Sequence, residues 1–372
     1  MAARKFRTVT RKIFLFITIF LSLVYLLAAL SPFLNAIRWW FIAILGLAFP
    51  YLLFGLLILA LAWVLVKPRI ALVLLLVITL GWKSISVILA FNMSGRFDYQ
   101  KKPDELRVVT WNVARFREIR ENNNQGSQTR LKMMALLKEQ NADVLCLQEL
   151  HDATKPGFYH NINYIRNELG YPYHYYLYDQ DGDRLFYGSA IFSRYPIIDT
   201  GFVRYPRPTL PDALLYADLK FHDDTVRIYT THLQSIQLQQ NELASIEHIE
   251  SPDDQLLQHS KPILSKLKNG FINRTIQARI IESVLINSPY PSLLCADFND
   301  VPNSYTYFSI RGSMQDAFLK KGIGFGRTYS SLSPTLRIDY ILASQSLKVL
   351  QFNRIIKPYS DHYMLVSDVR LK

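Results

Sequence analysis

Residues 292–299 read SLLCADFN, an apolar run that passes directly into Asp297, Phe298 and Asn299. A short apolar run of this kind is typical of a strand buried in a core. Carboxylate and amide side chains at the end of such a strand are either turn formers or members of a site that the strand holds in place. The other strands of the chain decide between these two interpretations.

Polar side chains stand at the end of several other apolar runs between residues 105 and 372. These runs are LRVVTWNV (106–113), DVLCLQEL (143–150), TVRIYTTHL (225–233), RIDYILAS (337–344) and DHYMLVSDVRL (361–371). The residues concerned are Asn112, Glu149, His232, Asp297, Asn299, Asp339, Asp361 and His362. Each alone has an ordinary explanation as a turn former, a cap or a core residue. Asp339 is the exception, because a carboxylate between Ile338 and Tyr340 is predicted to be buried and then requires partners.

The order of strands and helices predicts the fold class. Many short strands alternate with few helical patterns, at 157–169, 235–247 and 271–287, and no strict βαβ repeat is present. This order favours an α/β protein with two packed mixed β-sheets flanked by helices, a four-layer α/β sandwich. Cys146 and Cys295 both lie in apolar strand-like runs, and we expect them to be buried free thiols.

Residues 1–92 have a different character. Apolar runs cover about 13–31, 39–66 and 70–92, and each is long enough to cross a bilayer core of about 30 Å as a helix. Lys83 interrupts the third run, where it either marks a functional site or faces a neighbouring segment. We therefore predict a membrane anchor of three transmembrane helices in residues 1–92, a linker in 93–104 and a separate domain in 105–372.

The basic residues indicate an orientation in the membrane. The formal net charge is +12, but ten of the 42 Lys and Arg residues lie in 1–96, where no acidic residue is found, so residues 97–372 carry 32 basic and 30 acidic residues. Five basic residues precede the first run, Lys67 and Arg69 follow the second, and Arg38 alone lies in the first loop. The positive-inside rule then places the N-terminus in the cytoplasm.

Three crossings place the domain on the outer side, and we expect a bacterial inner membrane protein with a periplasmic domain. If Lys83 prevents the third crossing, the domain is cytoplasmic instead.

The motifs VVTWN, LCLQE, TTHL, ADFN, RIDYI and SDHY, taken in order, resemble the endonuclease/exonuclease/phosphatase superfamily of DNase I-like phosphohydrolases. The resemblance covers residues 105–372. The superfamily includes secreted DNases, abasic-site nucleases, sphingomyelinases and inositol-polyphosphate phosphatases. The resemblance implies a metal-dependent hydrolase of phosphate esters with Mg²⁺, or alternatively Mn²⁺, as its cofactor.

The resemblance also implies metal-site roles. Glu149 would be a principal metal ligand, and Asp361 would complete the metal site directly or through water. Asn112 would form hydrogen bonds near the metal and the phosphate. His232 matches the position of a family residue that contacts the scissile phosphate.

Catalytic roles are implied for the remaining positions. Asp297 would orient or deprotonate the attacking water, and Asn299 would steady the phosphate. Asp339 would pair with His362, whose imidazole would stabilise the pentacovalent phosphorus. The chain departs from the family at Ala296, where a Gly is usual, although it retains every polar position.

Three functional hypotheses remain open at the level of sequence. The first is an outward-facing phosphohydrolase acting on a phosphodiester or phosphomonoester, including a lipid-linked one, so that its partners are the bilayer and a lipid, small-molecule or nucleic-acid phosphate ester. The second is a membrane-anchored DNA or RNA nuclease, against which the near-neutral charge of residues 97–372 counts. The third is a binding module without catalysis, for which we would expect at least one lost ligand.

Three features bear on substrate choice. The segment 234–270 is long for a connection between strands, and it either determines specificity or forms a pair of outer helices. Arg274 and Arg279 follow it and either contact a phosphate or pair with a surface acid. The run YPYHYYLYD (171–179) either stacks on bases or lipid or forms a strand with one packed face.

Overall fold

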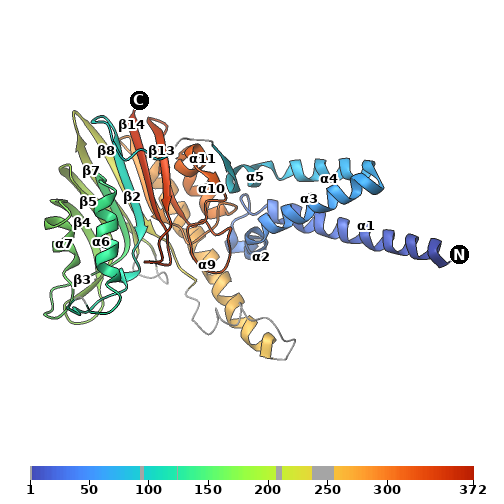
Figure 1. Cartoon of the computed structure of the whole chain (residues 1–372), viewed down its shortest axis with the longest axis horizontal. Coiled ribbons are helices and arrows are strands. Elements are labelled where there is room, and N and C mark those ends of the chain that lie inside the picture. The colour runs from blue at the N-terminus through green and yellow to red at the C-terminus, as the bar shows by residue number, and fades with distance from the viewer. Residues whose placement is uncertain (1, 93–95, 124, 207–211, 237–254) are drawn as a thin grey trace.

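The computed structural model describes residues 2–92, 96–123, 125–206, 212–236 and 255–372, with side chains from residue 9 and, in the last range, from residue 261. The described chain has two parts (Figure 1). A layered α/β domain forms one end, and helices from the first 92 residues extend away from it towards the N-terminus.

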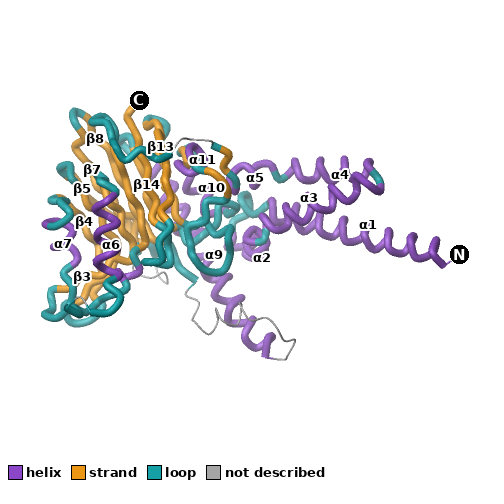
Figure 2. Tube along the Cα trace, viewed as in Figure 1, coloured by secondary structure: helices purple, strands orange, loops and turns teal. Residues whose placement is uncertain are grey.

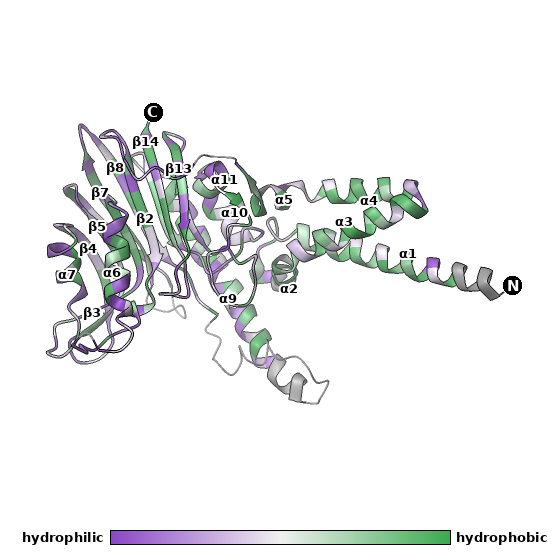
Figure 3. Ribbon diagram, in the orientation of Figure 1, coloured by the Kyte–Doolittle hydropathy of each residue, from purple (hydrophilic) through white to green (hydrophobic). Residues whose placement is uncertain are grey.

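The helices of the first part run back and forth along one direction (Figures 1 and 2). They are α1 (Ala2–Ala29), α2 (Ala36–Leu47), α3 (Phe49–Val66), α4 (Pro68–Leu80) and α5 (Trp82–Ile88). Val9–Ala29 of α1 and the whole of α3 are long and apolar enough to cross a membrane, and α4 with α5 would form a third crossing with a 69° bend. Apolar residues follow α1, α3 and α4 along most of their length (Figure 3).

Two of the expected helices are broken in the structure. The run 39–66, which we expected as one helix, is divided at Ala48 into α2 and α3, and α2 packs against α9 (Gln255–Ile286) through Ala43 and Phe271. The run 70–92 is divided at Gly81. Lys83, just after this break, is exposed and lies 5.1 Å from the centre of the Phe33 ring, so it faces a neighbouring segment.

The domain contains two six-stranded mixed sheets. The first has the order β13-β14-β2-β3-β5-β4, and the second has the order β10-β12-β9-β8-β7-β6. Only the pairs β2–β3 and β8–β9 are parallel. The first sheet consists of β2 (Leu106–Asn112), β3 (Val144–Ala153), β4 (Tyr173–Gln180), β5 (Leu185–Ser193), β13 (Leu347–Ile355) and β14 (Met364–Leu371), and the second of β6 (Ile197–Arg204), β7 (Ala213–Phe221), β8 (Asp224–His232), β9 (Ser292–Asp297), β10 (Gln315–Asp316) and β12 (Asp339–Ala343).

The alternation of side chains along the strands explains the four layers. Val108 and Cys146 of the first sheet and Leu293 and Cys295 of the second share the core between the sheets. Their sequence neighbours point to the outer faces. Val109 packs with α6 (Thr129–Glu139) and α7 (Asn161–Asn167), whereas the outer face of the second sheet packs with α9 and α10 (Tyr305–Arg311). The predicted four-layer sandwich is therefore confirmed, and both cysteines are buried and free as expected.

The remaining elements are short, and the long segment 234–270 is only partly described. The short elements are β1 (Ala90–Phe91), η1 (Ala114–Phe116), α11 (Ala317–Lys321) and β11 (Ile323–Gly324). The helix expected at 271–287 begins earlier, because α9 starts at Gln255, and the helix expected at 235–247 lies largely outside the described residues. The tyrosine-rich run forms β4, an edge strand of the first sheet.

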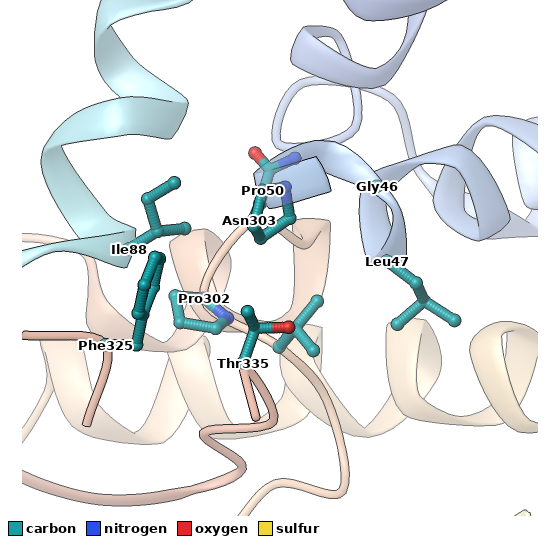
Figure 4. A pocket seen from close by; sticks show the side chains of 9 residues that line it. Gly46, Leu47, Pro50, Ile88, Pro302, Asn303, Phe325 and Thr335 are labelled. Carbon is teal, nitrogen blue, oxygen red and sulfur yellow. The ribbon is translucent and has the colours of Figure 1, made fainter. Parts of the chain in front are cut away.

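The helices of residues 2–92 are packed directly onto the domain. The Asn303 side chain donates to the Ala28 carbonyl at 3.2 Å, Arg337 donates to the Val87 carbonyl at 2.7 Å, and the Tyr51 hydroxyl lies 2.6 Å from that of Ser333. At this junction, residues of α2, α3 and α5 face residues 301–303, Phe325 and Thr335 across a cavity of about 10 Å³ (Figure 4). A cavity of this size holds about one water molecule, so the junction is closely packed.

The described part of the expected linker is also bound to the domain. The backbone N–H of Asp98 donates to Gln351 at 2.8 Å, and the Asp98 carbonyl accepts a hydrogen bond from the buried Arg107 guanidinium. Further upstream, β1 pairs with β11 in the antiparallel sense. Residues 96–104 therefore continue the packed structure.

Candidate active site

The predicted site residues of the second sheet lie in one row. His232 ends β8 and Asp297 ends β9, and the parallel register places the two residues opposite each other. Asp339 begins β12, and the antiparallel register places it opposite Asp297 on the other side. Residues opposite each other on neighbouring strands lie about 5 Å apart at their Cβ atoms. The backbone register alone thus brings a histidine and two carboxylates to one edge of the sheet.

Glu149 reaches the same edge from the first sheet through an irregularity in β3. The register of β3 against β5 shifts between Leu147 and Leu150, and Glu149 has a positive φ of 51°. A bulge of this kind redirects a side chain and is common beside active sites. Asn299 also has a positive φ, of 50°, immediately after β9. Strained backbone at two of the predicted positions is typical of a functional site.

Asn112 connects the two sheets at the centre of the site. Its Nδ2 donates to Glu149 Oε1 at 3.0 Å and to Asp297 Oδ2 at 3.1 Å, while its Oδ1 accepts from the Ala114 N–H. Both N–H bonds of Nδ2 are therefore used in holding the two carboxylates, whereas Oδ1 keeps one lone pair free.

His362 and Asp339 form a buried pair. His362 Nδ1 lies 3.0 Å from Asp339 Oδ2 and 3.7 Å from Asp297 Oδ2. Burial lowers the pKa of His362, but the carboxylates of Asp339 and Asp297 outweigh it and raise this pKa to about 10. The imidazole is therefore held in its cationic form at neutral pH, as the predicted role requires.

His232 is held in a similar way by a residue that the sequence did not reveal. Its Nδ1 lies 3.4 Å from Asp212 Oδ2, and its Nε2 lies 3.7 Å from Glu149 Oε1 and 3.8 Å from Asp297 Oδ2. Burial opposes the charged form, yet the carboxylates, Asp212 first, raise the pKa of His232 to about 10. Asp212 precedes β7, where no pattern in the sequence distinguishes it from a turn residue.

Asp361 pairs with a second residue that the sequence did not indicate. Arg117 Nη2 lies 3.0 Å from Asp361 Oδ1, and the Ser360 hydroxyl donates to the same oxygen at 3.2 Å. Arg117 itself has a positive φ of 60°, at the end of a run of four such residues that begins at Ala114. One oxygen of Asp361 is thus engaged by an arginine, and Oδ2 is the oxygen that it can offer to a metal or to a metal-bound water.

Asn299 completes the group. Its backbone N–H donates to Asp297 Oδ1 at 2.8 Å, and its side chain donates to the Leu233 carbonyl at 2.9 Å. Asn299, Glu149, Asp361 and His362 all line one cavity. The structure therefore brings all eight predicted site residues together at one end of the sandwich.

The donor set fits a hard divalent cation. Glu149 and Asp361 present carboxylates whose side chains are 28% and 36% exposed, and oxygen is the ligand that Mg²⁺ prefers. Asp297, Asp339 and His362 form a second group with potential ligand atoms within 4.8 Å of one another. His362 Nδ1 in that group already contacts Asp339 Oδ2 at 3.0 Å, and the assignment of the metal to Glu149 and Asp361 stays a prediction.

The other charged residues considered in the sequence have structural partners. Arg274 is buried and its Nε donates to Asp300 Oδ2 at 3.2 Å, whereas Arg279 is exposed and donates to the Tyr305 hydroxyl. Asp300 accepts the N–H of Val301. Asp316 caps α11 and accepts from Tyr307 and Arg337.

Two cavities lie beside the site residues. The first, of about 550 Å³, is lined by Glu149, Asp361 and His362 and extends towards α2, α3 and α9. The second, of about 290 Å³, lies on the far side of His232 and is lined by Asp181, Asp212 and residues of β4, β5 and β7. Both volumes are close to or within the range of small-molecule sites.

Buried, charged histidines beside carboxylates that fit a divalent cation define the class of metal-dependent phosphohydrolases. The chain belongs to the Endonuclease/Exonuclease/phosphatase family, which matches residues 109–362. It is accordingly a metal-dependent hydrolase that acts on phosphate esters. A second family, described as a domain of unknown function (DUF8431), matches residues 11–88.

Solved structures of the same superfamily resemble the chain. An endonuclease/exonuclease/phosphatase from Beutenbergia cavernae DSM 12333 is 20% identical over 72% of this chain and 72% of its own length, with a TM-score of 0.49. Humanized TDP2 of D. rerio is 17% identical (72% and 99% covered, TM-score 0.49), and the human Nocturnin catalytic domain with bound sulfate is 16% identical (73% and 96% covered, TM-score 0.49). No curated protein matches the chain.

Proposed function

We propose that this protein is a membrane-anchored phosphohydrolase that cleaves a phosphodiester or phosphomonoester, including a lipid-linked one, by in-line attack of water. The observation that carries the proposal is the continuous network from Glu149 through Asn112 and Asp297 to the His362–Asp339 pair. It contains the metal-binding carboxylates, a base and a cationic acid that phosphate-ester hydrolysis requires.

Glu149 and Asp361 would hold the metal ion. A bound Mg²⁺, or Mn²⁺ in its place, would bond phosphate oxygens and neutralise charge in the transition state. Asn112 keeps the Glu149 carboxylate in position, because its Nδ2 donates to that carboxylate and to Asp297 at the same time. The metal site and the base are thus fixed relative to each other.

Asp297 would orient the attacking water and accept its proton. Its carboxylate is fully buried and is oriented by the Asn299 N–H at Oδ1 and by Asn112 at Oδ2. Since Nδ1 of His362 faces Asp339, Nε2 is the nitrogen that can donate to a phosphate oxygen. His232, oriented by Asp212, would donate to the phosphate from the opposite side.

The position of the helix ends supports the membrane anchor and its orientation. Ala28 near the end of α1, Tyr51 near the start of α3 and Val87 in α5 all contact the domain. The N-terminus and the turn between α3 and α4 lie at the other end of the helices (Figure 1). The chain therefore crosses three times if it crosses at all, which favours the outward-facing alternative over the cytoplasmic one.

The N-terminal basic cluster and the basic residues that follow α3 lie at the end of the helices opposite the domain, whereas Arg38 and Lys83 lie nearer the domain. Lys67 and Arg69 lie at the turn between α3 and α4. The basic N-terminal segment begins α1 and lies at the same end of the helices. With this end in the cytoplasm, the catalytic domain is extracytoplasmic. We propose the periplasmic face of a bacterial inner membrane as its location.

A membrane-anchored DNA or RNA nuclease is the second candidate. The exposed side chains of Tyr173 and Tyr178 on the edge strand β4 favour it, because exposed aromatic rings stack on bases. The near balance of charge in residues 97–372 remains an argument against extensive phosphate contacts.

The test is Mg²⁺-dependent hydrolysis by the full-length protein in detergent, on phospholipids, sphingomyelin, polyprenyl phosphates, inositol phosphates, plasmid DNA and short single strands. We expect release from a phosphate ester that requires the divalent ion and is absent in Asp297→Asn. Cleavage of nucleic acid alone would establish the nuclease instead. Equal release by the wild type and Asp297→Asn on every substrate would reject both.

A further inference from the structure

The larger cavity at the site has two chemically different ends. At one end are the carboxylates of Glu149 and Asp361 and the imidazole of His362. The rest of its wall is mostly apolar and includes Ile44, Leu47, Tyr51, Ile263, Leu267 and Leu332. Catalytic residues that hydrolyse a water-soluble phosphate ester would not require an apolar wall of this extent beside them.

This apolar wall is built by the membrane helices. Ile44 and Leu47 belong to α2, and Ala48 and Tyr51 stand at the start of α3, the helix that is apolar enough to cross a bilayer. The cavity is therefore continuous with the end of a membrane span. A molecule whose apolar part leaves the bilayer beside α3 meets the catalytic residues without passing through water.

The surroundings of the cavity have the composition of a bilayer surface. Trp39 and Phe41 of α2 are exposed, and Lys268 of α9 lies 5.4 Å from the centre of the Trp40 ring. Aromatic residues gather at the interface between lipid and water, and lysines there attract anionic head groups. The opening of the cavity is thus expected at the level of the lipid head groups.

Leu332 provides independent support for an apolar occupant. It lines the cavity, is 42% exposed and has a positive φ of 66°, a conformation that costs energy for a leucine. Asn or Gly would be expected at this backbone position if no side chain were needed. An exposed, strained leucine at the wall indicates that an apolar surface is required there.

The second cavity has the opposite character. It is lined by Arg115, Asp179, Asp181 and Asp212 and by His232, which lies 3.7 Å from Glu149 in the wall of the first cavity. The reacting centre therefore lies between an apolar and a polar compartment. An amphiphilic phosphate ester has an apolar group on one side of its phosphate and a polar group on the other, and this arrangement matches those two sides.

We propose that the larger cavity binds the alkyl chain of a lipid phosphate ester, and that this chain determines substrate choice. The proposal rests on the proposed function, because the phosphate of the same molecule would lie at Asp297 and His362. Since burial of each methylene group is favourable by about 0.8 kcal/mol, each one that enters the cavity should raise kcat/KM by up to about fourfold.

The experiment compares short and long esters that stay monomeric in solution. The full-length protein in detergent is assayed with p-nitrophenyl octyl phosphate against p-nitrophenyl methyl phosphate, and with octyl phosphate against methyl phosphate by phosphate release. We expect kcat/KM for the octyl ester to exceed that for the methyl ester by at least about tenfold in the wild type.

Two variants address the cavity itself. Leu332→Asn removes apolar wall and suits the positive φ, so it should fold, and Ala48→Trp fills the cavity from the start of α3. The ratio of kcat/KM for the octyl ester to kcat/KM for the methyl ester should fall at least about threefold in Leu332→Asn and approach one in Ala48→Trp. Ile356→Asn, at an apolar residue outside the cavity that is 55% exposed against 42% for Leu332, is the control and should keep the wild-type ratio.

Each outcome is informative. A wild type that cleaves methyl and octyl esters equally well contradicts the alkyl-chain cavity and leaves the proposed hydrolase intact. If the preference for octyl over methyl esters persists in Leu332→Asn and Ala48→Trp, it arises from partition of the octyl ester into detergent. This result also contradicts the alkyl-chain cavity. If no ester is hydrolysed, the proposed function fails and this inference fails with it.

Discussion

At the scale of single residues, the site depends on carboxylates that orient two buried histidines. His362 is held by Asp339, and His232 is held by Asp212, so each imidazole has its own carboxylate partner. The burial of Asp339 follows from the Ile and Tyr residues around it in the sequence, and its pairing with His362 was implied by the family resemblance. The second does not, because Asp212 lies in an ordinary connection before β7 and only the tertiary fold brings it to His232.

Arg117 shows the same limit of prediction. It is brought to Asp361 by a run of left-handed residues, Ala114 to Arg117, in which no glycine signals the unusual backbone. The positions of Asn112 and Asp297, by contrast, could be predicted because each ends a strand, and strand ends lie at one edge of a sheet.

Glu149→Gln tests the metal site at this scale. The substitution keeps the size of the side chain and removes its negative charge, so a divalent ion should bind more weakly. We expect the Mg²⁺ concentration for half-maximal activity to rise at least about tenfold. Glu139→Gln, at the exposed end of α6, is the matched control, and an unchanged Mg²⁺ dependence in Glu149→Gln would remove Glu149 from the metal site.

At the scale of elements, the irregularities carry the information that the sequence did not provide. The bulge of β3 that turns Glu149 into the site leaves no mark in the pattern DVLCLQEL, which predicts a regular strand. The division of the run 39–66 at Ala48 was likewise invisible, because residues on both sides of the break are apolar. This break matters for function, since it places α2 beside the cavity.

Gly46 in α2 is expected to be essential for the packing of the membrane helices on the domain. A Cβ atom at this position would lie 2.5 Å from Ser31 Oγ and 2.9 Å from the Asn303 carbonyl (Figure 4 shows Gly46 and Asn303). Gly46→Ala should therefore destabilise the full-length protein by roughly 1–3 kcal/mol, measured by thermal unfolding in detergent.

Gly55→Ala in α3 is the matched control. There the new Cβ would meet only the end of the flexible Leu21 side chain, at 3.2 Å, and alanine favours the helix. An unfolding temperature of Gly46→Ala equal to or above that of Gly55→Ala would argue against a tight junction at Gly46.

At the scale of the whole molecule, the helices of residues 2–92, which we propose as the anchor, form one packed unit with the domain. One apolar cluster includes Phe49, Leu53 and Val87 of the anchor together with Tyr307 and Tyr340 of the domain. The sequence predicted the two parts and their order but separated them by a linker. The packing between the two parts could not be predicted from the sequence, because apolar residues that pack against a domain and those that face lipid look alike in a hydropathy pattern.

Removal of the anchor should therefore affect the domain. A chain of residues 97–372 would expose the apolar surface around Tyr307 and leave the buried Arg337 without its bond to the Val87 carbonyl. We expect it to unfold at a lower temperature than the full-length protein in the same detergent, or to aggregate in size-exclusion chromatography. A monodisperse domain of unchanged unfolding temperature would show that the anchor is only a tether.

The central claim is that the eight residues at the end of the sandwich hydrolyse a phosphate ester at the membrane. The most direct measurement is the Mg²⁺-dependent rate of the full-length wild type and of Asp297→Asn on the ester that the wild type cleaves best, with Asp223→Asn in an exposed turn as the control. The account predicts that Asp297→Asn loses at least about a hundredfold in rate while remaining folded and that Asp223→Asn does not. A wild-type rate in a folded Asp297→Asn protein would contradict the account.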